Sequence, residues 1–219
     1  MAFEGAKPYR IAPTSGSASN QDVIGSERQS LVDTLHGQHY ADCLAGRVFT
    51  QGATPLGLAI PIYSATAIAG GMPIWNPPGS GVNVEMVSVT LAYASGTSGY
   101  GAIGCLVRSL TQIATGSAMT ALAATTPKNG LALAGNTTKV QSSNAGACTV
   151  TAGVAGDWFR TLASMNLEAA TGTAHGLIVP KYDFDGTLIL PPGTLWYLAA
   201  TVASVALIAS EVTWKETAI

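Results

Sequence analysis

Apolar and polar residues alternate along much of the chain after Gly46, which is the pattern of strands that are buried on one face. The alternation is clearest over Val82–Tyr93. Apolar residues there occupy even positions as far as Met86 and odd positions from Val87 onward. A shift of one residue would turn the second half of a regular strand over, so the segment predicts a β-bulge at Met86–Val87.

Segments with strand character continue to the C-terminus and are separated by clusters of Gly, Pro, Ser and Asn, which favour turns. The segments are Gly57–Tyr63, Met72–Trp75, Val82–Tyr93, Gly101–Ser109, Lys139–Gln141, Ala147–Ala152, Trp158–Met165, Gly176–Pro180, Gly186–Leu190, Thr194–Val202 and Val205–Lys215. We interpret Thr111–Gly135, which has weak periodicity, as a long loop. Because no helical pattern separates the strands, residues 47–219 predict an all-β domain, an antiparallel β-sandwich of the jelly-roll type.

Residues 1–25 precede this sandwich and have the character of an extended N-terminal arm. Pro8 and Pro13 interrupt regular structure, and residues 14–20 form a small polar run. Two interpretations stay open: a disordered tail, or an arm that becomes ordered on a neighbouring subunit.

Residues 26–46 predict one short helix and a linker. Ser26 is a suitable N-cap with Gln29 three residues later, and Gly46 is a suitable end. Five residues recur at helical spacing and would form one face: Leu31, Val32, Leu35, His39 and Cys43. Gly37 costs about 1 kcal/mol relative to Ala in a helix interior, so we expect a bend or a break there.

Charged side chains are scarce in the predicted sandwich. Only 10% of the residues in the chain are charged, against about 25% in ordinary soluble domains, while 47% are hydrophobic. Between Thr50 and Gly156 the charged residues are Glu85, Arg108, Lys128 and Lys139. A surface with so little charge is typical of one that is partly buried against other subunits.

The charge balance also excludes some partners. The net charge is −2 and no Lys/Arg cluster is present, which argues against nucleic acid as a partner. No basic amphipathic segment indicates a membrane surface, Met1–Arg10 lacks the apolar core of a secretory signal, and Leu195–Ala209 is too short to span a bilayer. Three distant cysteines, Cys43, Cys105 and Cys148, argue against a disulfide framework and fit a protein that matures in a reducing cytosol.

Few residues could do chemistry. His36, His39 and Cys43 share one face of the predicted helix, but helical geometry spreads three such ligands and no fourth is evident. We therefore expect them to pack against a neighbouring sheet or subunit. His175 precedes a predicted strand, and the chain has no G-x-S-x-G motif that would supply a nucleophile. We assign no catalytic, cofactor-binding or metal-ligating residues and no cofactor.

Asp183 and Asp185 lie two residues apart on an extended segment, so their carboxylates share a face. We expect a solvated turn here, with a structural cation at a subunit contact as the alternative. In a hydrolase, this pair with Glu168 or Asp157 would supply the carboxylates.

Each of the four tryptophans falls in a different strand-like segment: Trp75, Trp158, Trp196 and Trp214. A row of exposed aromatic side chains would indicate carbohydrate binding, but this distribution predicts anchors in the core and in interfaces.

Several motifs resemble those of a family of tailed-bacteriophage virion proteins. The segments that carry the resemblance are Leu35–Tyr40 (LHGQHY), Gly46–Phe49 (GRVF), Ile74–Val84 (IWNPPGSGVNV), Leu190–Tyr197 (LPPGTLWY) and Val212–Glu216 (VTWKE). The resemblance implies a polar arm, a short helix and a β-sandwich, often in a trimer, that decorates or cements the head or covers the tail. It implies no catalytic residues.

Together these patterns predict a non-enzymatic capsid decoration and cement protein of the virion. We expect a homotrimer, assembled in the host cytoplasm, that bridges neighbouring subunits of the major capsid protein. The residues expected at capsid or subunit contacts are Tyr9, Leu31, Leu35, His36, His39, Tyr40 and Phe49. The alternative is a tail or vertex protein, either an adaptor or a module that binds glycans on the host surface.

Overall fold

The computed structural model describes residues 23–24, 30–31, 38–53, 56–63, 68–96, 101–109, 128–130, 137–142, 148–150, 156–165, 181–202 and 206–219. By its internal contacts the chain divides into two units, Met1–Ala41 and Asp42–Ile219. Within the first unit, strands β1 (Val23–Ile24) and β2 (Ser30–Leu31) pair antiparallel. The second unit, which we name the sandwich unit, contains every other described strand.

Helix α1 is much shorter than the sequence pattern predicts. It comprises only Tyr40–Leu44, and Ser30 and Leu31 lie in a strand, so the predicted helix over residues 26–46 is wrong in its extent. Helix nucleation is costly, and a glycine at position 37 adds to that cost. The predicted end is confirmed: Gly46 has a left-handed backbone (φ 69°), and its N–H donates to the carbonyl of Cys43. The arm residues 1–22 and the predicted cap Ser26 lie outside the described residues.

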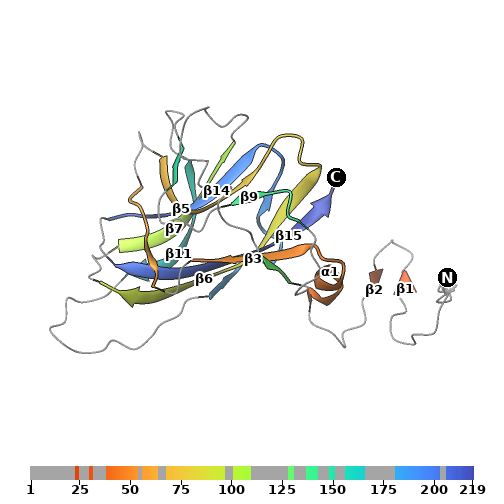
Figure 1. Ribbon diagram of the computed structural model, residues 1–219, viewed down its shortest axis with the longest axis horizontal. Coiled ribbons are helices and arrows are strands. Elements are labelled where there is room, and N and C mark those ends of the chain that lie inside the picture. Colours follow the sequence, from red (N-terminus) through yellow and green to blue (C-terminus); the bar gives the residue numbers. More distant parts are fainter. Residues whose placement is uncertain are drawn as a thin grey trace, which may run out of the picture. The chain divides into compact units, whose positions relative to one another are not determined.

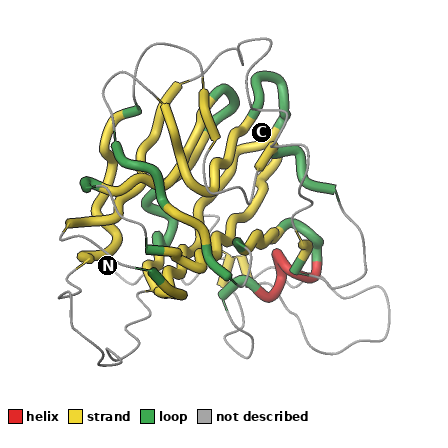
Figure 2. The backbone as a smooth tube through the Cα atoms, turned by 60° about the vertical axis from the view of Figure 1, so that its left-hand side comes forward, coloured by secondary structure: helices red, strands yellow, loops and turns green. Residues whose placement is uncertain are grey.

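The sandwich unit has two sheets (Figures 1 and 2). The first, which we name the β14 sheet, has the strand order β10-β5-β14-β7-β11, and β9 also pairs with β5. Its strands are β10 (Cys148–Val150), β5 (Ile68–Asn76), β14 (Thr194–Ala200), β7 (Gly101–Ser109), β11 (Asp157–Met165) and β9 (Gln141–Ser142).

The second sheet, the β15 sheet, has the order β12-β6-β15-β3-β8, with β13 on β6 and β4 on β15. Its strands are β12 (Lys181–Asp183), β6 (Val82–Ser95), β15 (Leu207–Ala218), β3 (Val48–Gly52), β8 (Lys128–Asn129), β13 (Ile189–Leu190) and β4 (Leu58–Ala59). All strand pairs in both sheets are antiparallel. The predicted all-β antiparallel sandwich is therefore confirmed.

Strands that are distant in the sequence pair across the sandwich. Early strands pair with late ones in a nested series, in which β3 pairs with β15, β5 with β14, β6 with β12 and β7 with β11. Two further pairs, β15 with β6 and β14 with β7, join the members of this series into sheets. The N-terminal strand of the sandwich unit thus lies beside its C-terminal strand.

The core lies between the sheets and draws on both of them. Its fully buried side chains include Met86 and Trp214 from the β15 sheet and Trp196 from the β14 sheet. Phe49 stacks on Trp214, with ring centroids 6.1 Å apart and an interplanar angle of 25°. Burial of each such side chain contributes about 1.5–3 kcal/mol.

The bulge predicted in β6 is confirmed. Thr213 of β15 pairs with Ser88, and the next residue, Trp214, pairs with Met86, so Val87 has no partner of its own. The extra residue restores the alternation, because Met86 and Val89 both become buried in the core.

Candidate functional site

The predicted contact residues have different outcomes. Tyr9, Leu35 and His36 lie outside the described residues, and Leu31 lies in β2. His39 is half-buried in the turn before α1, and Tyr40, the first residue of α1, is exposed.

Phe49 requires a correction. It is only 2% exposed and belongs to the core cluster, where it stacks on Trp214. The alternation in β3 directs this side chain between the sheets, so it offers almost no surface to a partner.

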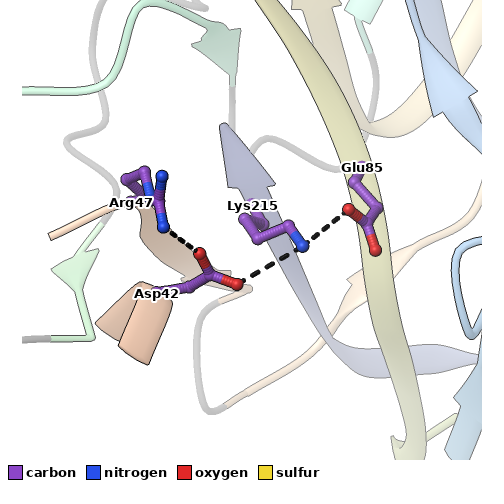
Figure 3. Close-up of polar contacts among 4 residues, drawn as sticks. All are labelled: Asp42, Arg47, Glu85 and Lys215. Carbon is purple, nitrogen blue, oxygen red and sulfur yellow. Dashed lines mark hydrogen bonds and ion pairs between the residues drawn. The ribbon is translucent and has the colours of Figure 1, made fainter. Parts of the chain in front are cut away.

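A cluster of four charged side chains binds the beginning of the sandwich unit to the β15 sheet (Figure 3). Asp42 of α1 pairs with Arg47 (2.5 Å) and with Lys215 of β15 (3.3 Å). Lys215 also pairs with Glu85 of β6, at 2.7 Å. The four charges balance, and three of the side chains are largely buried, so the cluster holds one end of α1 at a defined place on the sheet.

Lys215 is the centre of this cluster, and its pKa is raised. Burial alone lowers the pKa of a lysine, but the hydrogen bond to Glu85 and the charges of Asp42 and Glu85 outweigh burial here. Lys215 is therefore charged at every physiological pH. Next to the cluster, Leu44 of α1 is 56% exposed, which leaves an apolar side chain in water where the chain enters the sandwich unit.

A second buried acid, Glu216, ties a distant segment to the end of β15. Its carboxylate accepts hydrogen bonds from the Thr138 hydroxyl, from the backbone N–H of Lys139 (3.0 Å) and from the Trp214 indole N–H (3.3 Å). Such charge-assisted bonds satisfy a buried carboxylate without a cation. Glu216 therefore has a structural role.

The outer face of the β14 sheet carries a second apolar cluster, apart from the core. Trp75 and Leu106 pair with Leu195 and Tyr197, respectively, and all four side chains are buried although they point away from the core. The Tyr197 hydroxyl accepts a hydrogen bond from the backbone N–H of Gly156, at 2.9 Å. This face of the sheet is therefore largely covered.

Trp158 and Tyr63 border this second cluster. The indole ring of Trp158 lies against Gly104, where an added Cβ would overlap with the ring. Tyr63 meets Trp158 edge to face, with ring centroids 6.1 Å apart, and Tyr63 is exposed. Trp75, Trp196 and Trp214 are buried, as the sequence predicts, whereas Trp158 is only half-buried.

The outer face of the β15 sheet differs from that of the β14 sheet. Its residues in the middle of the sheet are partly or fully exposed and mostly polar. Ser88, Thr90 and Thr213 are small and uncharged, whereas the residues that pair with Thr90 and Ser88 on the flanking strands include the exposed charged residues Glu211, Lys181 and Asp183. The hydroxyl groups of Thr213 and Thr50 are 3.0 Å apart and form a hydrogen bond across the strands. Of the two outer sheet faces, this one is accessible to a partner.

Asp183 and Asp185, the two carboxylates that the sequence places on one face, have different surroundings in the structure. Asp183 forms an exposed ion pair with Lys181 (2.8 Å), and Asp185 lies in a turn with a left-handed backbone (φ 47°). No group of three His, Cys, Asp or Glu side chains within the described ranges could hold a metal ion. Glu168 and His175 lie outside these ranges.

Cys43 and Cys105 are free thiols. Burial raises the pKa of Cys105 from its ordinary value of 9.0 to about 11, so this thiol is protonated and unreactive near neutral pH. The side chain of Cys148 lies outside the described part of the chain.

No protein-family model matches this chain, and comparisons with curated proteins and with solved structures give no match either. Where the structure is described, no helix has the length and apolar character that crossing a bilayer requires.

Proposed function

We propose that the chain is a non-enzymatic virion structural protein that decorates and cements the capsid of a tailed bacteriophage. It bridges neighbouring subunits of the major capsid protein and acts as a homotrimer. The observation that carries the proposal is the accessible outer face of the β15 sheet. Small polar side chains such as Ser88, Thr90 and Thr213 lie there beside a few charged ones, of which Lys181 and Asp183 pair with each other. A sheet face of this kind suits contact with protein surfaces more than capture of a charged small ligand.

The proposal includes a jelly-roll topology. The eight strands β3, β5, β6, β7, β11, β12, β14 and β15 can be numbered one to eight along the chain. The sheet orders are then 6-3-8-1 and 2-7-4-5. A long antiparallel hairpin that pairs 1 with 8, 2 with 7, 3 with 6 and 4 with 5, and then wraps around a core, produces this order. The four pairs present here support it.

The mechanism is mechanical. Residues 1–41 act as an arm on neighbouring coat subunits, and the cluster of Asp42, Arg47, Glu85 and Lys215 holds the point where this arm joins the sandwich unit. Each contact with the capsid is weak, but a trimer repeats it three times. Linked weak contacts raise the overall affinity by orders of magnitude without any new interaction.

The experiment is a truncation before Asp42, which keeps the charged cluster intact. The shortened chain and the full chain are added to heads that lack the protein, and bound copies are counted against the coat protein. We expect the truncated protein to keep its circular dichroism spectrum and its cooperative thermal transition but to lose head binding. Full occupancy by the truncated protein would refute the role of the arm.

A tail or vertex location is the second candidate function. The observation that favours it is the half-exposed aromatic group on β11, where Trp158 meets Tyr63 and Phe159 is exposed. Copy number in purified particles separates the two functions. Hundreds of copies support the cement role, about a dozen support the tail or vertex role, and none would refute both.

A further inference from the structure

Arg160 connects the two sheets at one edge of the sandwich unit. It belongs to β11, at the end of the β14 sheet, and pairs with the core residue Cys105. Its Nη1 donates to the Tyr182 hydroxyl (2.5 Å) and to the Thr187 hydroxyl (3.2 Å). Tyr182 lies in β12, the end strand of the β15 sheet, so the guanidinium spans the space between the two end strands.

The charge of Arg160 is not neutralised within the described part of the chain. Arg47, Lys181 and Lys215 each have a carboxylate partner there, whereas both partners of Arg160 are neutral hydroxyl groups. A guanidinium has five N–H donors, and both of these hydrogen bonds leave from Nη1. The donors on Nε and Nη2 have the fork geometry that matches a carboxylate.

Two aromatic rings flank the cation. The Arg160 Cζ atom lies 5.4 Å from the centroid of the Phe159 ring and 5.5 Å from that of Tyr182, which are distances of cation–π interactions. Phe159 is the extra residue in a bulge of β11, because Trp158 pairs with Leu106 and Arg160 with the adjacent Cys105. Phe159 is 42% exposed, so an apolar ring and an unneutralised cation lie side by side at the surface.

We propose that Arg160, Phe159 and Tyr182 form a binding site for a carboxylated sugar of the hexuronic acid class. The sugar carboxylate pairs with the N–H groups on Nε and Nη2 of Arg160, which make no hydrogen bond to another described residue, and the C–H face of the sugar ring packs on Phe159. A sugar fits better than an acidic peptide side chain because a pyranose ring has both a flat apolar face and a carboxylate at a fixed distance. This inference does not rest on capsid binding. It goes beyond the proposed function, which requires no small-molecule ligand.

The test is an NMR titration of the full-length protein, labelled with ¹⁵N and ¹³C, with glucuronate. Glucose and acetate serve as matched probes, because each keeps only one half of the ligand. We expect glucuronate to shift the Arg160 side-chain N–H signals and the Phe159 ring signals, and to bind with an affinity at least ten-fold higher than that of acetate. Glucose should cause no shift. Equal affinity for acetate would overturn the sugar assignment, and absence of shifts with glucuronate would overturn the site.

Two variants and a control locate the binding. Phe159→Ala removes the stacking surface but leaves both hydrogen bonds of Arg160 in place, so we expect the affinity for glucuronate to fall at least five-fold while that for acetate stays the same. Arg160→Gln should abolish binding of both. Lys128→Gln, an exposed substitution in β8, should change neither. If Arg160→Gln does not fold, Phe159→Ala and the three probes still decide, since an unchanged glucuronate affinity in Phe159→Ala would refute the site.

Discussion

The two sheets of the sandwich unit are buried in different ways. All seven residues of β14 are buried, whereas buried and partly exposed residues alternate along β15. One face of β14 joins the core through Trp196 and Leu198, and the other joins the second apolar cluster through Leu195 and Tyr197. A strand that is buried on both faces needs a continuous run of hydrophobic residues. A strand with one face in solvent needs hydrophobic and polar residues in alternation. The middle of the β15 sheet's outer face is therefore accessible to a partner, whereas the middle of the β14 sheet's outer face is buried.

The largest difference in the free energy of unfolding should lie between two substitutions, one on the outer face of each sheet. Leu195→Ala should lower the free energy of unfolding by about 2–5 kcal/mol, because it leaves a cavity in the second apolar cluster. Thr90→Ala, on the outer face of the β15 sheet, should change it by less than about 0.5 kcal/mol. Urea denaturation followed by tryptophan fluorescence measures both. Similar losses in the two variants would contradict the comparison.

The second-largest effect should be a loss of stability at alkaline pH, which comes from buried groups of the β14 sheet. Burial raises the pKa of Cys105 to about 11 and also raises the pKa of Tyr197. Both groups ionise more readily in the unfolded chain. The contribution of Cys105 to stability is complete below pH 9.0 and is lost as the pH rises through about 11, and the contribution of Tyr197 is also lost at alkaline pH. Lys215 has the same sign, since its raised pKa means that the folded state keeps the proton longer.

The measurement is the free energy of unfolding between pH 8 and pH 11. The Cys105→Ala variant should start from a lower stability but decline less steeply than the wild-type protein over this range. An equal slope in the two proteins would show that Cys105 does not contribute to the alkaline loss.

A smaller effect should come from crowding Trp158. Gly104→Ala places a Cβ where the indole ring lies, so the ring or strand β11 must move, at a cost of about 1–3 kcal/mol. Gly52→Ala in β3 is the matched control, because the nearest neighbour of its added Cβ is the Ser210 carbonyl oxygen at 3.9 Å. Thermal unfolding distinguishes them, and a Gly104→Ala protein as stable as the control would show that Trp158 does not cover this face.

The smallest effect should come from the charged cluster on the β15 sheet. Lys215→Gln removes the cation that Asp42 and Glu85 share, and we expect a loss of about 1 kcal/mol, since partly screened ion pairs contribute little. Added salt should reduce the difference between variant and wild type. Chemical denaturation at low and high ionic strength tests this, and a loss that does not depend on salt would argue against an electrostatic role.

Local patterns in the sequence predict some elements well and others poorly. The segment Gly101–Ser109 forms β7 with the predicted bounds, and the bulge in β6 appears at Val87. Strand β3 is absent from the prediction, because its polar Gln51 faces the interior and breaks the alternation. Strand β12 is also absent, since its charged residues Lys181 and Asp183 give an end strand no apolar signal. The predicted strand Gly176–Pro180 lies outside the described residues.

The two candidate sites were beyond the reach of local patterns. Arg160 meets Tyr182 from a strand that is distant in sequence and belongs to the other sheet. Lys215 reaches Asp42 because the last strand of the chain pairs with β3, at the beginning of the sandwich unit. Nothing in the spacing of these residues along the chain indicates that they meet.

The sequence by itself determined the all-β class and most of the long strands, β3 and β12 excepted, because alternation and turn residues act within a few positions of one another. It also determined the scarcity of charge on which the proposed function rests. Only the tertiary structure decided which sheet face is covered, that Phe49 belongs to the core, and that Arg160 lies between two rings without a carboxylate partner in the described part of the chain. These outcomes depend on which distant strands pair, and that choice is made by the packing of the whole sandwich unit.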